Sequence, residues 1–283
     1  DKGYFPIYQM RDQNVKVWNG TEYSETTVRK TGENQKMVTV VTNNGMSLTC
    51  TEYHKFYIET GSRPAQKSRV KIVEAKNLLP GMNIIRYEVP IVTNQTETLD
   101  YAYTHGMFCA EGTYSTAKGS HNNQCSHKAR HNNLCFRHQN CTKDFSETVA
   151  QSNRCLATTR KDKPILYLYG EKQQLIKHID FIGNVTSNSN RLNIQLPKDI
   201  APKYFVPINY TINSKLEWLA GVCDGDGCVV RNDGLCNILI SNTNITFLTD
   251  ILYLLQTLGI QSAVTKCMDK RIVALPNGKG GSK

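Results

Sequence analysis

The chain has 283 residues, of which 39% are hydrophobic and 20% are charged. This composition is typical of a folded globular protein of about two domains rather than of a disordered chain. No apolar run reaches the ~18 residues of a membrane-spanning helix, and the first residues lack the apolar segment of a signal peptide. Lys and Arg outnumber Asp and Glu by 34 to 24, so the net charge of +10 favours a polyanionic partner such as nucleic acid.

The first 92 residues or so favour β-structure. Short β-branched runs such as "VKVWNG", "MVTVVTNNGMSLTC" and "HKFYIETG" are separated by turn signals, among them Asn19-Gly20 and Asn44-Gly45. We therefore predict an all-β N-terminal domain over residues 1–94 and a domain of mixed helices and strands over residues 95–283.

Helical spacing of apolar residues begins after residue 95. It predicts helices in "TLDYAYTHGMFCAEG", "EKQQLIKHIDFIG" and "NITFLTDILYLLQTLGI". This region also repeats itself, because "YTHGMFCAEGTYS" aligns with "WLAGVCDGDGCVV" so that Gly106 meets Gly221 and Glu111 meets Asp226. The duplication predicts two similar halves related by a pseudo-twofold axis.

Both copies carry small residues at matching places, spaced by four and therefore on one helix face: Gly106 with Ala110, and Gly221 with Gly225. Small residues on one face allow two helix backbones to approach closely, and this approach would bring Glu111 and Asp226 together. Two carboxylates ~4 Å apart repel by about 4 kcal/mol at an effective dielectric near 20. They need a shared proton or a divalent cation, and Mg²⁺ (or Mn²⁺) suits a site with few oxygen ligands.

These motifs resemble the signature of the LAGLIDADG homing endonucleases, "LAGVCDGDG" closely and "THGMFCAEG" as a degenerate first copy. The resemblance implies two αββαββα-type halves in one monomeric chain that binds a double-stranded DNA target in its host gene. It implies that Glu111 and Asp226 hold catalytic Mg²⁺, while Asp224 has no direct catalytic role. The first copy departs from the signature at Thr104, His105 and Cys109.

Two alternatives for the motif are a buried glycine-containing helix and a calcium-binding EF-hand loop. The EF-hand fails because Cys228, Val229 and Leu235 stand where that loop needs an oxygen ligand, a glycine and a glutamate.

Further residues follow from the same resemblance. "KYFVP" is similar to an element that precedes the second motif in intein endonucleases, which implies that Lys203 enters the active site, with Lys266 as a weaker candidate. A solvated surface lysine is the alternative for each. In this family the strands lie in the DNA major groove, so we expect four side chains there to read bases: Arg231, Asn232, Asn237 and Ser241.

The front end resembles the Hint domain of inteins. "GMSLTCTEYHKFYI" matches a conserved block in which Thr51 and His54 would take part in splicing, with the histidine polarising the scissile peptide. "VKVWNGTEYSETTVRKTGE" is similar to inteins of ribonucleotide reductases, so the whole chain looks like a large intein. The nucleophilic Cys or Ser and the terminal His-Asn of an intein are absent from the ends, so we do not expect this chain to splice as given. A structural role is the alternative for His54.

An insert at about residues 117–160 is rich in cysteine and histidine. Reduced thiols with imidazoles are good Zn²⁺ ligands, and without a secretion signal metal binding is favoured over disulfides. The predicted zinc ligands are Cys125, Cys135, His138 and Cys141, with His127, His131 and Cys155 as substitutes. Four basic residues there are predicted to contact DNA phosphate: Lys118, Lys128, Arg130 and Arg137. The alternative is a basic disordered loop with incidental cysteines.

Three functions are compatible with these observations. The chain is predicted first as a site-specific DNA endonuclease on an intein scaffold, intracellular and either cytoplasmic or nuclear with its host protein. A DNA-binding protein of the same fold that no longer cuts is the second possibility, since the first motif is degenerate. The third is a splicing remnant with a passive insert.

Overall fold

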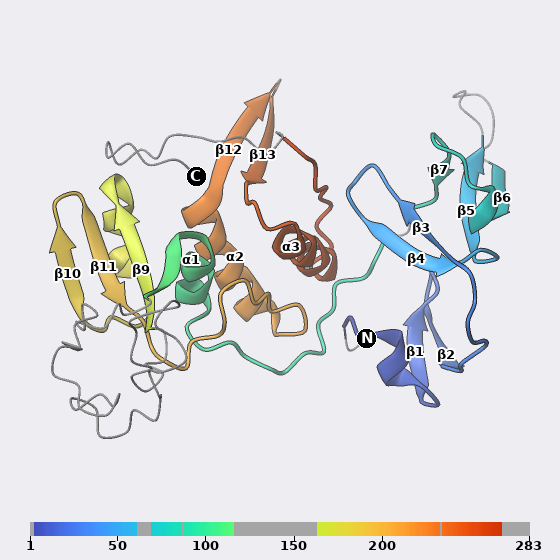
Figure 1. Ribbon diagram of the computed structural model, residues 1–283, viewed down its shortest axis with the longest axis horizontal. Coiled ribbons are helices and arrows are strands. Elements are labelled where there is room, and N and C mark those ends of the chain that lie inside the picture. The colour runs from blue at the N-terminus through green and yellow to red at the C-terminus, as the bar shows by residue number, and fades with distance from the viewer. Residues whose placement is uncertain (1–2, 61–68, 87, 116–162, 233, 268–283) are drawn as a thin grey trace, which may run out of the picture. The chain divides into compact units, whose positions relative to one another are not determined.

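The computed structural model describes residues 3–60, 69–86, 88–115, 163–232 and 234–267 (Figure 1). These residues form two compact units. The first contains the described residues of Asp1–Thr98, Val206–Lys215 and Asn242–Lys283, and the second contains those of Leu99–Phe205 and Leu216–Ser241. The units are defined by contacts, so the division at residue 94 into a splicing part and an endonuclease part stays a prediction.

Strands dominate the front of the first unit, as the alternating runs predict. They are β1 (Asn14–Trp18), β2 (Tyr23–Thr27), β3 (Met37–Val41), β4 (Ser47–Thr51), β5 (Lys55–Thr60), β6 (Arg69–Glu74) and β7 (Asn83–Ile84), with short 3-10 helices at Ile7–Met10 and Ala75–Asn77. All pairs are antiparallel, in sheets ordered β1-β2, β3-β4 and β6-β5-β7. The predicted Asn19-Gly20 and Asn44-Gly45 turns connect β1 to β2 and β3 to β4.

The first unit also contains α3 (Ile245–Thr257), which confirms the helix predicted in "NITFLTDILYLLQTLGI". The side chain of Asn244 caps its first turn by accepting a hydrogen bond from the Phe247 N–H at 3.2 Å. Its apolar stripe is buried, at Phe247, Ile251, Leu252 and Leu254. The helix therefore forms because capping and amphipathic spacing agree.

The second unit contains the duplicated motifs. The first copy runs α1 (Ala102–Glu111), β8 (Gly112–Ser115), β9 (Lys163–Tyr169), η4 (Gly170–His178), β10 (Val185–Asn188) and β11 (Arg191–Gln195). Its four strands form an antiparallel sheet in the order β10-β11-β9-β8 (Figure 1). The second copy runs α2 (Ile212–Asp226), β12 (Gly227–Asn232) and β13 (Leu235–Ile240), and the first four residues of α2 are counted with the first unit.

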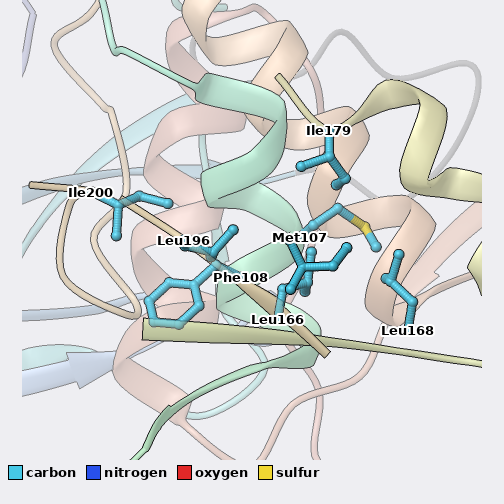
Figure 2. Packing of buried hydrophobic residues seen from close by; sticks show 8 residues of the cluster. Met107, Phe108, Leu166, Leu168, Ile179, Leu196 and Ile200 are labelled. Atoms are coloured by element: carbon cyan, nitrogen blue, oxygen red, sulfur yellow. The ribbon is translucent and has the colours of Figure 1, made fainter. Parts of the chain in front are cut away.

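A hydrophobic core fixes α1 against this sheet (Figure 2). Met107 and Phe108 are fully buried on α1, and Leu166 and Leu168 of β9 are buried with them. The cluster is completed by Ile179, Ile194, Leu196 and Ile200. Because β9 alternates buried leucines with less buried residues, one face of the sheet packs on the helix and the other is left for polar groups.

The mixed α/β fold with small antiparallel sheets agrees with the expected class only in part. The first copy has the predicted αββ-helix-ββ order, but "EKQQLIKHIDFIG" contributes the 3-10 helix η4 instead of an α-helix. No side chain caps the N-terminus of η4 and none of its residues is fully buried, so little favours a longer α-helix. In the second copy, no strand follows α3 among the described residues, which run to 267.

Within the described ranges, no helix has the length and apolar content needed to cross a membrane.

Lys215 is a fully buried cation in the first unit. Its ammonium donates hydrogen bonds to Gln95 Oε1 at 2.7 Å and to Thr257 Oγ1 at 3.0 Å, both neutral oxygens. Burial lowers the pKa of Lys215 from 10.5 to about 8, because desolvation disfavours the charged form. The unfolded chain therefore binds more protons than the folded one between pH 8 and 10.5, and folding is favoured as pH rises through that window.

We predict that replacing Lys215 with Met removes this pH dependence. The free energy of unfolding of the parent should rise between pH 7.5 and 10 by about 2 kcal/mol relative to Lys215→Met, because the pKa of Lys215 is lowered from 10.5 to about 8 on folding. Urea denaturation at a series of pH values measures the difference. Lys198→Met, at an exposed lysine, should keep the parental rise. Parallel curves for the parent and Lys215→Met would contradict the prediction.

Candidate active site at the ends of two paired helices

The helices α1 and α2 touch through their glycines, as the spacing predicts. A methyl group added to Gly106 would overlap the carbonyl oxygen of Trp218, with the carbonyl carbon 3.0 Å away. A methyl group added to Gly221 would overlap the carbonyl oxygen of Tyr103, again with the carbon 3.0 Å away. Any larger residue at either position would therefore push the two backbones apart.

These two contacts are reciprocal. The alignment that pairs Gly106 with Gly221 also pairs Tyr103 with Trp218. Gly106 therefore contacts Trp218, and its counterpart Gly221 contacts Tyr103, the counterpart of Trp218. A contact in which corresponding residues exchange places is the mark of a twofold arrangement, here between two copies within one chain.

The same contact continues to the C-terminal ends of both helices. A methyl group on Gly225 would overlap the Cβ atom of Ala110 and lie 3.6 Å from Cγ of Glu111. Glu111 is the last residue of α1, and Asp226, the last residue of α2, directly follows Gly225. The two predicted acids therefore end adjoining helices. The negative ends of the two helix dipoles add to the negative charge of the carboxylates, so cations are favoured at this place.

Two lysine ammonium groups bind oxygen atoms at these helix ends. The Lys172 ammonium, from η4, forms an ion pair with Glu111 and donates a hydrogen bond to the carbonyl oxygen of Gly225. The Lys203 ammonium donates to the carbonyl oxygen of Gly112, the residue after Glu111. Lys203 was predicted from the sequence and lies at this site, whereas Lys172 was not predicted.

Asp226 lies within electrostatic range of Tyr204 and Cys109. Burial is the main cause that raises the pKa of both side chains, and the charge of Asp226 raises each pKa further. The pKa of Cys109 reaches about 12, so its thiol is protonated at neutral pH. A protonated buried thiol is a poor nucleophile.

Hydrogen bonds explain two departures of the first motif from the signature. Trp218 Nε1, a donor only, donates to Nδ1 of His105 at 2.9 Å, so Nε2 of the neutral ring carries the proton and donates to the Pro202 carbonyl at 3.0 Å. Burial lowers the pKa of His105 and keeps the ring neutral. Thr104 Oγ1 donates to Asp180 Oδ2 at 3.1 Å and accepts from the Asp180 N–H at 2.9 Å.

Asp224 accepts a hydrogen bond from the Tyr103 hydroxyl at 2.7 Å. The bond joins α2 to α1, so Asp224 fastens the helix pair. Burial, followed by this bond, raises the pKa of Tyr103. A structural role agrees with the expectation that Asp224 takes no direct part in catalysis.

Gly112 and Gly227 directly follow the two helices and begin β8 and β12. Gly112 is extended, with φ −89° and ψ 164°, and a methyl group there would overlap the ring of Phe108. The glycine is needed for packing against its own helix.

The strand residues predicted to read DNA do not share one face. In the β12–β13 ladder Val230 is opposite Asn237 and Arg231 is opposite Cys236. Since directly opposed residues point to the same side and successive residues alternate, Arg231 and Asn237 project from opposite faces. The four predicted residues therefore cannot all enter one groove. Asn232 ends β12, and Ser241 follows β13 and is exposed.

The sheet of the first copy presents a polar face that the sequence analysis did not single out. Arg191 is opposite Tyr169, Asn193 is opposite Tyr167, and all four point away from the core leucines. The Arg191 guanidinium lies 4.7 Å from the centre of the Tyr167 ring and donates a hydrogen bond to the Tyr169 hydroxyl at 2.9 Å. Alternation in "KPILYLY" and "RLNIQ" was the signal for this face.

The remaining predicted residues lie elsewhere. Thr51 ends β4, and its carbonyl accepts the His54 N–H at 3.0 Å, while the exposed His54 ring packs edge-on against Phe56. Lys266 follows α3 in the first unit and is exposed. The insert lies outside the described residues, with all its predicted zinc ligands and basic contacts: Cys125, His127, His131, Cys135, His138, Cys141, Cys155, Lys118, Lys128, Arg130 and Arg137.

Across the part of the chain that the structure describes, no three His, Cys, Asp or Glu residues gather into a metal site. The helix ends instead combine carboxylates with main-chain carbonyls. The Glu111 carboxylate and the Gly225 carbonyl already bind one cation, the Lys172 ammonium. Such hard oxygen donors suit Mg²⁺, which accepts few protein ligands and keeps waters.

Comparison with known proteins relates the part of the chain that contains α2 and α3 to a protein family. Residues 213–274 match the LAGLIDADG-like domain. The chain therefore carries a LAGLIDADG-like domain, as its second motif indicated.

The whole chain is also similar to ribonucleoside-diphosphate reductases. It is 34% identical over 294 residues to the large subunit of Invertebrate iridescent virus 6, and 22% identical over 261 residues to the NrdEB subunit alpha of Bacillus subtilis (strain 168). These alignments cover 100% and 89% of this chain but only 26% and 22% of the relatives. The chain thus spans about a quarter of the length of its relatives, as an intein inserted in such a reductase would, and the predicted resemblance is confirmed.

We predict that Gly221→Ala destabilises the protein although alanine is the better helix former. Helix propensity alone would stabilise the variant by about 1 kcal/mol. Overlap with the Tyr103 carbonyl should instead lower the free energy of unfolding by about 1–3 kcal/mol. Chemical denaturation measures the sign, and a stabilised variant would show that the backbones are not in contact.

Proposed function

We propose that the chain is a site-specific double-stranded DNA endonuclease of the intein-encoded homing type. The observation that carries this proposal is the reciprocal glycine contact, which joins the ends of α1 and α2 and with them Glu111 and Asp226. Duplicated halves in one chain suit a target with two DNA strands, and one chain supplies both acids. The proposed partner is therefore duplex DNA, bound by a monomer inside the host cell.

Glu111, Asp226 and the neighbouring main-chain carbonyls are proposed to hold Mg²⁺ or Mn²⁺. When bound, a divalent cation would supply Lewis-acid stabilisation of a phosphate and an activated water. The ammonium of Lys203 is proposed to offset the negative charge that develops on the phosphate. Lys266 remains a weaker candidate for the same task.

DNA contact is proposed to use the sheet surfaces. The outer face of β9 and β11 offers Arg191, Tyr167, Tyr169 and Asn193, side chains that suit phosphate contacts and base edges. On β12 and β13, either the face of Arg231 or the face of Asn237 would be used. The basic residues of the insert, Lys118, Lys128, Arg130 and Arg137, are proposed to add phosphate contacts.

The front end is proposed to be a partial Hint segment of an intein. The support is its strand-rich fold, the turn shared by Thr51 and His54, and the end-to-end similarity to a portion of a reductase large subunit. In a chain with both splice junctions, His54 would polarise the scissile peptide.

The proposal is tested with supercoiled plasmid carrying the reductase large-subunit gene without this segment. Incubation with the protein and Mg²⁺ should give a linear product from that plasmid and none from the empty vector. Tight binding without a linear product would favour the non-cutting DNA-binding protein. Absence of any DNA affinity would favour a splicing remnant with a passive insert.

Asp226→Asn is predicted to abolish cleavage and leave DNA binding nearly intact. The loss should exceed about 100-fold, because even outer-shell partners of a catalytic metal contribute about 10- to 100-fold. Asp224→Asn is the matched control, with the same charge change two residues earlier on α2, and it should still cut. Gel-based cleavage and binding assays measure both effects. Cutting by Asp226→Asn at the parental rate would overturn the assigned role.

Structural zinc is proposed for the insert, with Cys125, Cys135, His138 and Cys141 as ligands. Elemental analysis should find about one zinc per chain, and the double variant Cys135→Ala with Cys141→Ala should lose it. The double variant Cys228→Ala with Cys236→Ala removes two exposed cysteines of β12 and β13 and should keep the metal. A parent protein without zinc would end this proposal.

A further inference from the structure

The Lys172 ammonium holds a position between oxygens of two different helices. It pairs with the carboxylate at the end of α1, on Glu111, and with the carbonyl one residue before the end of α2, on Gly225. Lys172 itself comes from a third element, η4. A carboxylate and a main-chain carbonyl that converge on one cation form the start of a hard-cation shell.

We propose that Lys172 is a built-in counter-cation that competes with the divalent metal for Glu111 and Gly225. This inference rests on the proposed function, because it concerns the metal centre assigned to the same acids. Without metal, Lys172 satisfies Glu111 and the carbonyl. With metal, these oxygens turn to the divalent ion and the ammonium is released.

The geometry favours competition over simultaneous binding. The ammonium contacts Glu111 and the Gly225 carbonyl directly, so a divalent ion on the same oxygens would face its positive charge at contact distance. The pair is only partly covered, with 38% of the Lys172 side chain and 22% of the Glu111 side chain exposed. A partly exposed pair is weak enough for a divalent ion to replace, and the flexible stem of lysine allows the ammonium to swing away.

Competition has a consequence for DNA binding. A released ammonium stays tethered beside the metal centre, where it can contact an anionic phosphate. Metal and DNA would then favour each other's binding. Metal on Glu111 and Gly225 frees the ammonium for phosphate, and phosphate that holds the ammonium frees those oxygens for metal, so the coupling is reciprocal.

The test measures metal affinity without DNA, with Mn²⁺ as the probe and the electron paramagnetic resonance signal of free Mn²⁺ as the readout. Binding that is lost in Glu111→Gln defines the site. Lys172→Met should bind Mn²⁺ at this site about fivefold more tightly than the parent, the factor that a partly exposed ion pair contributes. Lys172→Arg, which keeps a cation beside Glu111, should stay close to the parent.

Lys177→Met is the matched control, because Lys177 lies exposed on the same helix η4 and its loss changes the net charge equally. It should leave Mn²⁺ affinity unchanged. The ratio between Lys172→Met and the parent should persist at about 1 M salt, where charges beyond about 3 Å are screened. A ratio that falls to one there would show long-range repulsion only and overturn the proposal.

The failures of the two proposals are distinguishable. If Glu111→Gln abolishes Mn²⁺ binding but Lys172→Met binds no more tightly than the parent, competition is wrong and the metal centre stands. If no variant, including the parent, shows binding that depends on Glu111, the metal centre itself fails and the competition fails with it.

Discussion

The site depends on one steric constraint, the passage of two helix backbones close enough to exclude even a methyl group. Gly106 and Gly221 face carbonyl groups of the opposite helix, and Gly225 faces Ala110. This contact sets the position of the helix ends and therefore of Glu111 and Asp226. Close packing costs helix propensity at three glycine positions, and it places two acids where two helix dipoles are negative.

The negative charge at the helix ends is balanced by lysines from neighbouring segments. Lys172 and Lys203 arrive from η4 and from the segment before α2, and both bind oxygen atoms at these ends. The neighbouring Cys109 and His105 are buried and uncharged, so they add no competing charge. The site is thus a small group of charged side chains on a neutral, well-packed support.

The residues that could be predicted from the sequence are those that belong to a motif or to a regular spacing of apolar side chains. The duplicated glycines, Glu111, Asp226 and helix α3 follow from spacing alone. Lys172 does not, because nothing in "GEKQQLIKH" shows that this lysine turns toward a helix 61 residues away. The bond between Trp218 and His105 was also missed, since it joins two copies that are distant in the chain. The side of a strand from which Arg231 or Asn237 projects required the register of the ladder.

The reciprocal contact also has an evolutionary consequence. In a homodimer each mutation appears twice across the axis, so both partners of a contact change together. In a fused duplicate the copies drift separately, provided that the backbones still pass closely. The corresponding residues Tyr103 and Trp218 differ in this way, because Tyr103 bonds to Asp224 and Trp218 bonds to His105. The two copies therefore share one backbone contact while the side-chain bonds beside it differ.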